Sequence, residues 1–183
     1  MKKKATTSDI GDRGEALVKR KLERFGFNVE HLKPRARYYD LIARKDGQAI
    51  NVQVKSFRSK EPTLNPVTKF AKIDIIDEKQ YYKGLRPLTD PKAIWVWVYF
   101  APDGSNSFYL TPEAEVQKIV CKIYSAFLDR ANHKRPRNPY SLHLVVYLSE
   151  LKRWKDCWSL FPGVPSRFAW DNEEDIRIVK PKP

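Results

Sequence analysis

One tight turn near residue 46 can bring three polar side chains together. Asp40 lies before the dipeptide Asp46-Gly47, and Gln53 and Lys55 lie after it. This dipeptide is a strong signal for a two-residue hairpin loop. Counting outward from the loop places Asp40 opposite Gln53, with their Cβ atoms about 5 Å apart. Strand alternation puts Lys55 on the same face as Gln53.

An acid, an amide and an amine in this arrangement can support metal-assisted hydrolysis. Asp and Gln oxygens are hard ligands that suit Mg²⁺, which keeps several waters when a protein binds it. Lys55 can orient or deprotonate a water molecule, or stabilise charge on a phosphate. The competing interpretation is an exposed hairpin face with an ordinary Asp–Lys pair, worth under about 1 kcal/mol.

Glu15 is the fourth candidate, and it belongs to a helix predicted over residues 8–25. Ser8 is the expected N-cap of this helix, and Gly26 is the expected stop. Glu15 borders the apolar stripe of the helix, so it can reach the hairpin cluster. A glutamate at the rim of the core is the alternative. The apolar stripe at helical spacing consists of Gly14, Leu17, Val18, Leu22 and Phe25.

The remaining elements predict an α/β (α+β) domain around a mixed sheet. Strands are expected at 27–32, 39–43, 48–55, 94–100, 108–110 and 142–148, and further helices at 111–130 and 149–158. Residues 56–65 are expected to form a loop, and 70–82 predict no element. We expect a single domain over residues 1–160 and an irregular C-terminal tail over 161–183.

The charge of the chain predicts a polyanionic partner. The formal net charge is +13, and the basic excess is concentrated in residues 1–60. Nucleic acid is the first candidate partner, and an inert basic surface is the alternative. Phosphate contacts give affinity without sequence information. The candidates for such contacts are Lys33, Arg35, Arg37, Arg58, Lys60, Lys69, Lys134, Arg135 and Arg137.

Cysteine usage and hydropathy predict a cytoplasmic protein. Cys121 and Cys157 match no metal-ligand spacing, so we expect reduced packing residues. The longest apolar run, 94–101, is far shorter than the roughly 20 residues of a spanning helix. Basic residues 2–4 are followed by no apolar segment of the kind found in a signal peptide.

The motifs around the four candidates resemble those of the PD-(D/E)XK nuclease superfamily, whose fold is restriction-endonuclease-like. The matching stretches are residues 11–15 (GDRGE), 39–42 (YDLI) and 52–56 (VQVKS). They are similar to members with a Gln-x-Lys signature, as in some homing endonucleases and Holliday-junction-resolvase-like proteins. The resemblance implies a mixed β-sheet flanked by helices, in the order αβββαβ.

The resemblance also implies a role for each matched residue in the hydrolysis of DNA phosphodiester bonds with Mg²⁺, for which Mn²⁺ can substitute. Asp40 would be the main metal ligand, and Gln53 would take the place of a second acidic ligand. The carbonyl of Val54 would complete the protein ligands. Lys55 would activate water or stabilise the phosphate. Glu15 would contact the metal through water.

Two departures from the superfamily pattern keep other functions open. Gln53 stands where Asp or Glu is usual, so the site has one less negative charge, and Tyr39 precedes Asp40 where the name motif has Pro. The first hypothesis is a Mg²⁺-dependent endodeoxyribonuclease. The second is a catalytically inactive nucleic-acid-binding module on the same fold, and the third is an interaction protein with a fortuitous motif. Cleavage of two strands would favour a homodimer or a higher homo-oligomer.

Overall fold

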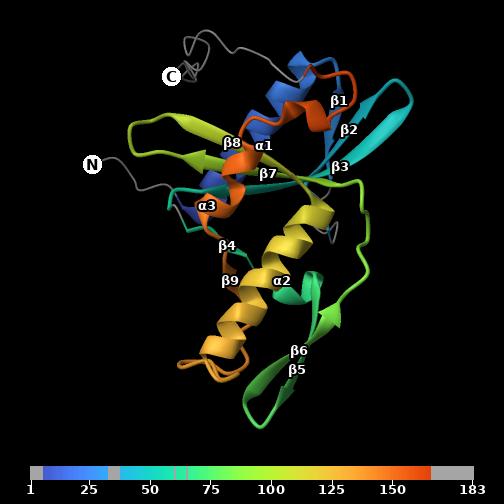
Figure 1. Ribbon diagram of the computed structural model, residues 1–183. Helices are drawn as coiled ribbons and strands as arrows, with labels where there is room; N and C mark the ends of the chain where they lie inside the picture. Colours follow the sequence, from blue (N-terminus) through green and yellow to red (C-terminus); the bar gives the residue numbers. More distant parts are fainter. Residues whose placement is uncertain (1–5, 33–37, 60, 65, 166–183) are drawn as a thin grey trace.

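A five-stranded mixed sheet forms the centre of the computed structural model, which describes residues 6–32, 38–59, 61–64 and 66–165 (Figure 1). The strand order is β1-β2-β3-β7-β8. All neighbouring strands are antiparallel except β3 and β7, which are parallel, so the predicted mixed sheet is confirmed. The strands are β1 (Asn28–His31), β2 (Leu41–Lys45), β3 (Gln48–Phe57), β7 (Ile94–Phe100) and β8 (Asn106–Pro112).

The hairpin of β2 and β3 has the predicted loop and register. Asp46 and Gly47 have φ angles of 49° and 74°, as a two-residue hairpin loop of this kind requires. Ile42 pairs with Asn51. Strand β2 begins only at Leu41, and β3 continues to Phe57, two residues beyond the predicted end. The second half of β3 therefore extends past the start of β2.

Helix α1 (Thr7–Arg24) covers one face of the sheet. Its N-cap is Thr6 and not Ser8, because Thr6 and Asp9 exchange hydrogen bonds in a capping box. Gly26, at φ 84°, follows its end as predicted. The apolar stripe of α1 packs on the side chains of Val52, Val54, Val96 and Val98 from the central strands.

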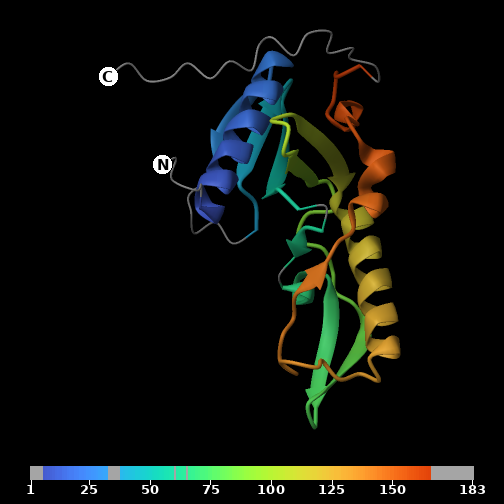
Figure 2. The same ribbon diagram turned by 90° about the vertical axis from the view of Figure 1, so that its left-hand side faces the viewer.

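Helix α2 (Glu113–Arg130) belongs to a second core on the other face of the sheet. Trp95 and Trp97 are buried in that core. The helix continues beyond the sheet and packs beside a hairpin of β5 (Ala71–Ile76) and β6 (Lys79–Leu85), which makes the molecule elongated (Figures 1 and 2). The small β4–β9 sheet, of Thr63–Leu64 and Leu144–Val145, lies between these two parts.

The element order differs from αβββαβ. In the described residues between β3 and β7 there is no α-helix, and the crossover consists of β4, the short helix η1 (Val67–Lys69), β5 and β6. Helix α2 comes only after β8. The stretch 70–82, for which the sequence predicts no element, belongs largely to the β5–β6 hairpin. Its turn residues Asp77 and Glu78 both have positive φ without a glycine, so the usual turn signal is missing.

The C-terminal part contains less regular structure than predicted. The strand expected at 142–148 is only the two-residue β9, and 149–158 contains α3 (Leu148–Leu151) and the short helix η2 (Lys152–Trp154) in place of one helix. A further short helix, η3 (Trp158–Leu160), precedes Phe161 and Val164, which are buried in the core beside α1. Residues 166–183 of the predicted tail lie outside the described residues.

No helix in the described part of the chain is long and apolar enough to cross a membrane. Cys121 and Cys157 are both free cysteines, and Cys121 is buried.

Candidate active site

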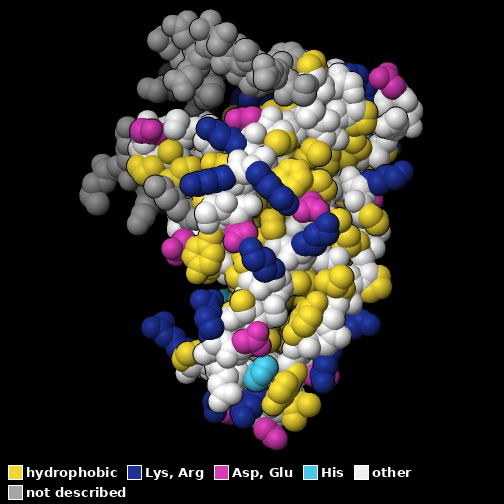
Figure 3. All heavy atoms as spheres, in the orientation of Figure 1, with side chains coloured by type: hydrophobic (Ala, Val, Ile, Leu, Met, Phe, Trp, Pro, Cys, Tyr) yellow, Lys and Arg dark blue, Asp and Glu magenta, His cyan; other side chains and the backbone are white. Residues whose placement is uncertain are grey.

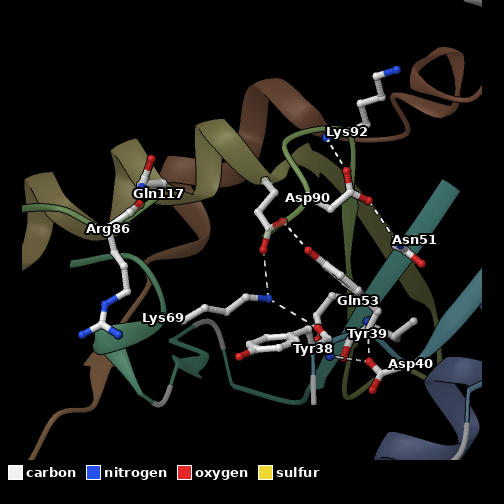
Figure 4. Close-up of polar contacts among 12 residues, drawn as sticks. Tyr38, Tyr39, Asp40, Asn51, Gln53, Lys69, Arg86, Asp90, Lys92 and Gln117 are labelled. Carbon is white, nitrogen blue, oxygen red and sulfur yellow. Dashed lines mark hydrogen bonds and ion pairs between the residues drawn. The ribbon is translucent and has the colours of Figure 1, made fainter. Parts of the chain in front are cut away.

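Asp40 lies at the point where the pairing of β2 with β3 stops. Its main-chain N–H donates to the carbonyl of Val52 at 2.9 Å, which continues the ladder by one residue. Its side-chain Oδ2 then accepts the main-chain N–H of Val54 at 2.7 Å. The side-chain amide of Gln53 contacts the same oxygen (Figure 4). The predicted opposition of Asp40 and Gln53 is thus present as a direct side-chain contact.

Gln53 and Lys55 point to the side of β3 that faces α2, whereas Val54 points to the α1 side. The parallel register places Gln53 beside Trp95 and Lys55 beside Trp97, both of which belong to the α2-side core. The amide nitrogen of Gln53 is also 3.5 Å from the carbonyl oxygen of Val54. The edge of β3 left open by the short β2 therefore gathers a carboxylate, an amide and a main-chain carbonyl.

Glu15 reaches the same opening from α1. Its Oε2 is 3.4 Å from Nδ1 of His31, the last residue of β1, and His31 pairs with Leu41 next to Asp40. Burial raises the pKa of Glu15, the nearby carboxylate of Asp40 raises it further, and His31 opposes this rise. The two acids are thus close enough to repel each other.

The pKa of Asp40 shows how its surroundings balance its charge. Burial raises this pKa, while the hydrogen bond from Val54 lowers it, followed by the charges of Lys69, Lys55 and then His31. The structure therefore brings the predicted Glu15 and Lys55 within electrostatic reach of Asp40, from opposite sides of the sheet. His31 also belongs to this group, although sequence spacing suggests no chemistry for it.

A buried polar network adjoins Asp40 on the α2 side (Figure 4). The hydroxyl of Tyr39 donates to Oε2 of Glu113 at 2.7 Å, and Glu113 is fully buried. Burial, and then this hydrogen bond, raise the pKa of Tyr39. Nζ of Lys69 lies 2.9 Å from Oε1 of Glu113, an ion pair without the alignment of a hydrogen bond. The side chain of Lys69, a predicted candidate for a phosphate contact, is only 17% exposed and is ion-paired with Glu113.

The other predicted phosphate contacts lie in different parts of the molecule. Arg58 is exposed and lines a cleft of about 390 Å³ together with Arg13, Phe100 and Asn106. The segment 131–139 follows the end of α2, at the far end of the molecule from β2 (Figures 1 and 2). The predicted residues Lys33, Arg35, Arg37 and Lys60 lie outside the described residues.

Two of the three basic residues in that segment have protein partners. Lys134 is ion-paired with Glu78 at 2.8 Å. The guanidinium of Arg135 lies over the ring of Phe127 at 4.8 Å and donates to the carbonyl of His143. Arg137 is exposed. On the face shown in Figure 3, Lys and Arg side chains are spread among acidic and hydrophobic ones and do not form one patch.

The donor groups around Asp40 suit a hard divalent cation. In the part of the chain that the structure describes, no three His, Cys, Asp or Glu side chains form a group that can hold a metal ion. The candidate donors are instead a carboxylate, an amide and the Val54 carbonyl, with Glu15 close by, and Mg²⁺ accepts such mixed oxygen ligands with water. A half-turn of the Gln53 amide would present its oxygen beside Asp40. Burial is the main reason that the pKa values of Asp40 and Glu15 are raised, and a cation bound beside them would stabilise their charged forms.

Comparisons with known proteins add a likeness to solved structures. No protein-family model matches the chain, and no curated protein matches it. A solved structure that matches is that of a bacterial homing endonuclease, I-Ssp6803I. It is 14% identical in sequence, with a TM-score of 0.44, and the match covers 85% of this chain and 93% of that chain.

Proposed function

We propose that this protein is a divalent-metal-dependent endonuclease that hydrolyses DNA phosphodiester bonds. The observation that carries the proposal is the position of the Asp40 carboxylate. It is held by the N–H of Val54, contacts Gln53, and lies within electrostatic reach of Glu15 and Lys55. Two acids and a lysine gathered at one unpaired strand edge lower the stability of the fold unless their charges are compensated by pairing or by a bound ion.

The metal would be held by the carboxylate of Asp40, the amide oxygen of Gln53 and the carbonyl of Val54, with Glu15 acting through water. When bound, Mg²⁺ polarises the phosphate and makes water a better nucleophile at neutral pH. Nζ of Lys55 would orient the attacking water and stabilise the charge that develops on the phosphoryl oxygens. His31 would hold the carboxylate of Glu15 in place through their 3.4 Å contact.

The charge of the chain supports a nucleic acid as the substrate. The formal net charge is +13, which favours association with a polyanion. Arg13 and Arg58 line a cleft near the N-terminal half of α1 and the end of β3, so they are candidates for contacts to the DNA backbone beside the site. Cleavage of both strands would require two active sites, which a symmetric homodimer supplies.

A plasmid cleavage assay with Mg²⁺ tests the proposal. Wild-type protein should cut the plasmid, and EDTA should abolish cutting. Asp40→Asn and Lys55→Ala should each lower the rate by about 100-fold or more. Asp74→Asn and Lys72→Ala, which change exposed residues of β5, are the matched controls and should cut like the wild type. Cutting that survives both site substitutions would contradict the proposal.

A nucleic-acid-binding module without cleavage is the second candidate function. Gln53 favours it, because an amide in place of an acid weakens metal binding, and its nitrogen contacts Asp40 in the structure. Retention of DNA binding with no cutting at any Mg²⁺ or Mn²⁺ concentration would favour this function. Binding that weakens steeply with added salt would show that phosphate contacts dominate.

A further inference from the structure

Lys69 meets the candidate site from the crossover between β3 and β7. It is the last residue of η1, Glu113 is the first residue of α2, and Tyr39 directly precedes Asp40. Three segments far apart in the sequence thus converge beside Asp40 (Figure 4). Tyr39 and Glu113 alone are 74 residues apart.

The surroundings of the Lys69 ammonium are specific. Besides its ion pair with Glu113, Nζ donates to the main-chain carbonyl of Tyr38 at 3.4 Å. It lies 4.8 Å from the ring centre of Tyr39 and 4.7 Å from that of Trp95, within the range of cation–π contacts. The ammonium therefore contacts both residues that immediately precede Asp40, one through its backbone and the other through its ring.

The segment before Asp40 depends on such contacts because it lies outside the sheet. Strand β2 begins at Leu41, and the last main-chain rung to β3 is the hydrogen bond from Asp40 to Val52. Tyr38 and Tyr39 have no strand pairing among the described residues. Lys69 and Glu113 thus anchor Tyr38 and Tyr39, the two residues before Asp40.

We propose that Lys69, held by Glu113, is a positioning residue that fixes residues 38–39 and thereby keeps the Asp40 carboxylate at the Val54 N–H, ready for a divalent cation. The inference rests on the function proposed above. It gives the crossover between β3 and β7 an indirect influence on the metal site. Lys69 contacts neither substrate nor metal in this role and acts through Tyr38 and Tyr39.

A double substitution tests this role without leaving a lone buried charge. Lys69→Met alone would leave the buried carboxylate of Glu113 without its ion-pair partner. It is therefore combined with Glu113→Gln, so that the double variant loses both charges and keeps the net charge of the protein. The amide introduced by Glu113→Gln retains an acceptor oxygen for the Tyr39 hydroxyl. The matched control is Lys122→Met with Glu150→Gln, which removes an ion pair of 3.6 Å between the surfaces of α2 and α3 and also keeps the net charge unchanged.

Two measurements are made on each protein after a melting curve has shown that it is folded. One is Mn²⁺ binding by calorimetry without DNA, and the other is the Mg²⁺ concentration for half-maximal plasmid cleavage. Loss of a residue that orients a metal ligand weakens metal binding by roughly 10- to 100-fold. We expect such a loss in the Lys69/Glu113 variant and none in the control. A role in folding alone would lower the melting temperature and leave Mn²⁺ affinity unchanged.

The outcomes separate this inference from the proposed function. Unchanged Mn²⁺ affinity and unchanged Mg²⁺ dependence in the folded double variant overturn the role of Lys69, even if the wild type cuts DNA and Asp40→Asn does not. If the wild type binds Mn²⁺ but cuts no DNA, the proposed function fails. The Mn²⁺ affinities of the wild type and the double variant then still test the role of Lys69. A wild type that binds no Mn²⁺ overturns both proposals.

A second variant serves if the double variant is unfolded. Tyr39→Leu removes the ring that Lys69 contacts together with the hydroxyl that donates to Glu113. We expect it to weaken Mn²⁺ binding in the same direction, by less than the double variant would. Mn²⁺ affinity equal to that of the wild type would then overturn the inference.

Discussion

The carboxylate of Asp40 accepts the main-chain N–H of Val54 at 2.7 Å and so replaces the carbonyl that β2 would supply if the strand began earlier. The last hydrogen bond between the two sides of the hairpin is thus accepted by the side chain of Asp40. The pairing of β3 with β7 fixes the position of Val54. The N–H of Val54 in turn holds the carboxylate of Asp40. The same contact leaves the edge of β3 open to Glu15, which belongs to α1 on one face of the sheet.

Replacement of Asp40 should separate its structural and chemical roles. Asp40→Ala leaves the buried N–H of Val54 without its acceptor, so we expect the free energy of unfolding to fall by about 1–3 kcal/mol. Asp40→Asn keeps an acceptor oxygen and should unfold at nearly the wild-type urea concentration. Both variants should fail to bind Mn²⁺. Equal stability of the two variants would show that the hydrogen bond from Val54 contributes little.

Gln53→Glu should restore the missing negative charge. With a second carboxylate beside Asp40, the Mg²⁺ concentration for half-maximal cleavage should fall by about tenfold, equivalent to about 1.4 kcal/mol of binding free energy. Without a metal, repulsion between the two acids should lower the melting temperature, and added Mg²⁺ should raise it again. Thermal melts with EDTA and with Mg²⁺ measure both effects.

Asn51→Asp provides a comparison for that substitution, because it adds a charge on the same face of β3 beside a different acid. Asn51 donates to Asp90 at 2.9 Å, so the new carboxylate would face Asp90. We expect a lower melting temperature in Asn51→Asp too, but no tenfold fall in the Mg²⁺ concentration for half-maximal cleavage. An equal gain in both variants would mean that charge anywhere on this face suffices, and that Gln53 has no special position.

The capping box of α1 should give the protein a stability that is lost in acid. Hydrogen bonds from the backbone and then the side chain of Thr6 lower the pKa of Asp9. A carboxylate with a lowered pKa contributes stability above its unfolded-state pKa and loses it as the pH falls through the folded-state pKa. Melting curves across the acidic range should therefore show a smaller acid-induced loss in Asp9→Asn than in the wild type. An identical pH profile for the two proteins would contradict this account.

Local patterns in the sequence predict one part of the candidate site well. The Asp46-Gly47 loop fixes the register of β2 and β3, and this register brings Asp40 next to Gln53. The helical period places Glu15 beside the packed face of α1. Both signals act over a few residues, and tertiary packing does not override them here.

Contacts between distant segments leave no such signal. The burial of Lys69 follows from its partner Glu113, which the sequence places at an ordinary helix start where an acid is favourable anyway. His31 reaches Glu15 only because β1 ends beside Leu41. Periodicity in either segment gives no information about these pairings, so Lys69 is predicted from its charge alone as a candidate phosphate contact.

Gly14→Ala should disturb the site through packing alone. An added Cβ at Gly14 would lie 1.8 Å from Oγ and 3.0 Å from Cβ of Ser56, so α1 and β3 would have to move apart. Overpacking of this kind costs about 1–3 kcal/mol. Because Glu15 is the next residue, the shift should also weaken Mn²⁺ binding. Urea unfolding and calorimetry measure the two effects.

Gly11→Ala is the matched control, since it lies in the same helix and nothing lies within 4 Å of its added Cβ. It should raise the free energy of unfolding by about 0.5–1 kcal/mol, because alanine loses less backbone entropy in a helix. Ser56→Gly combined with Gly14→Ala should recover part of the lost Mn²⁺ affinity, because it removes both contacting atoms. A Gly14→Ala protein with wild-type stability and affinity would show that α1 does not need this close approach to present Glu15.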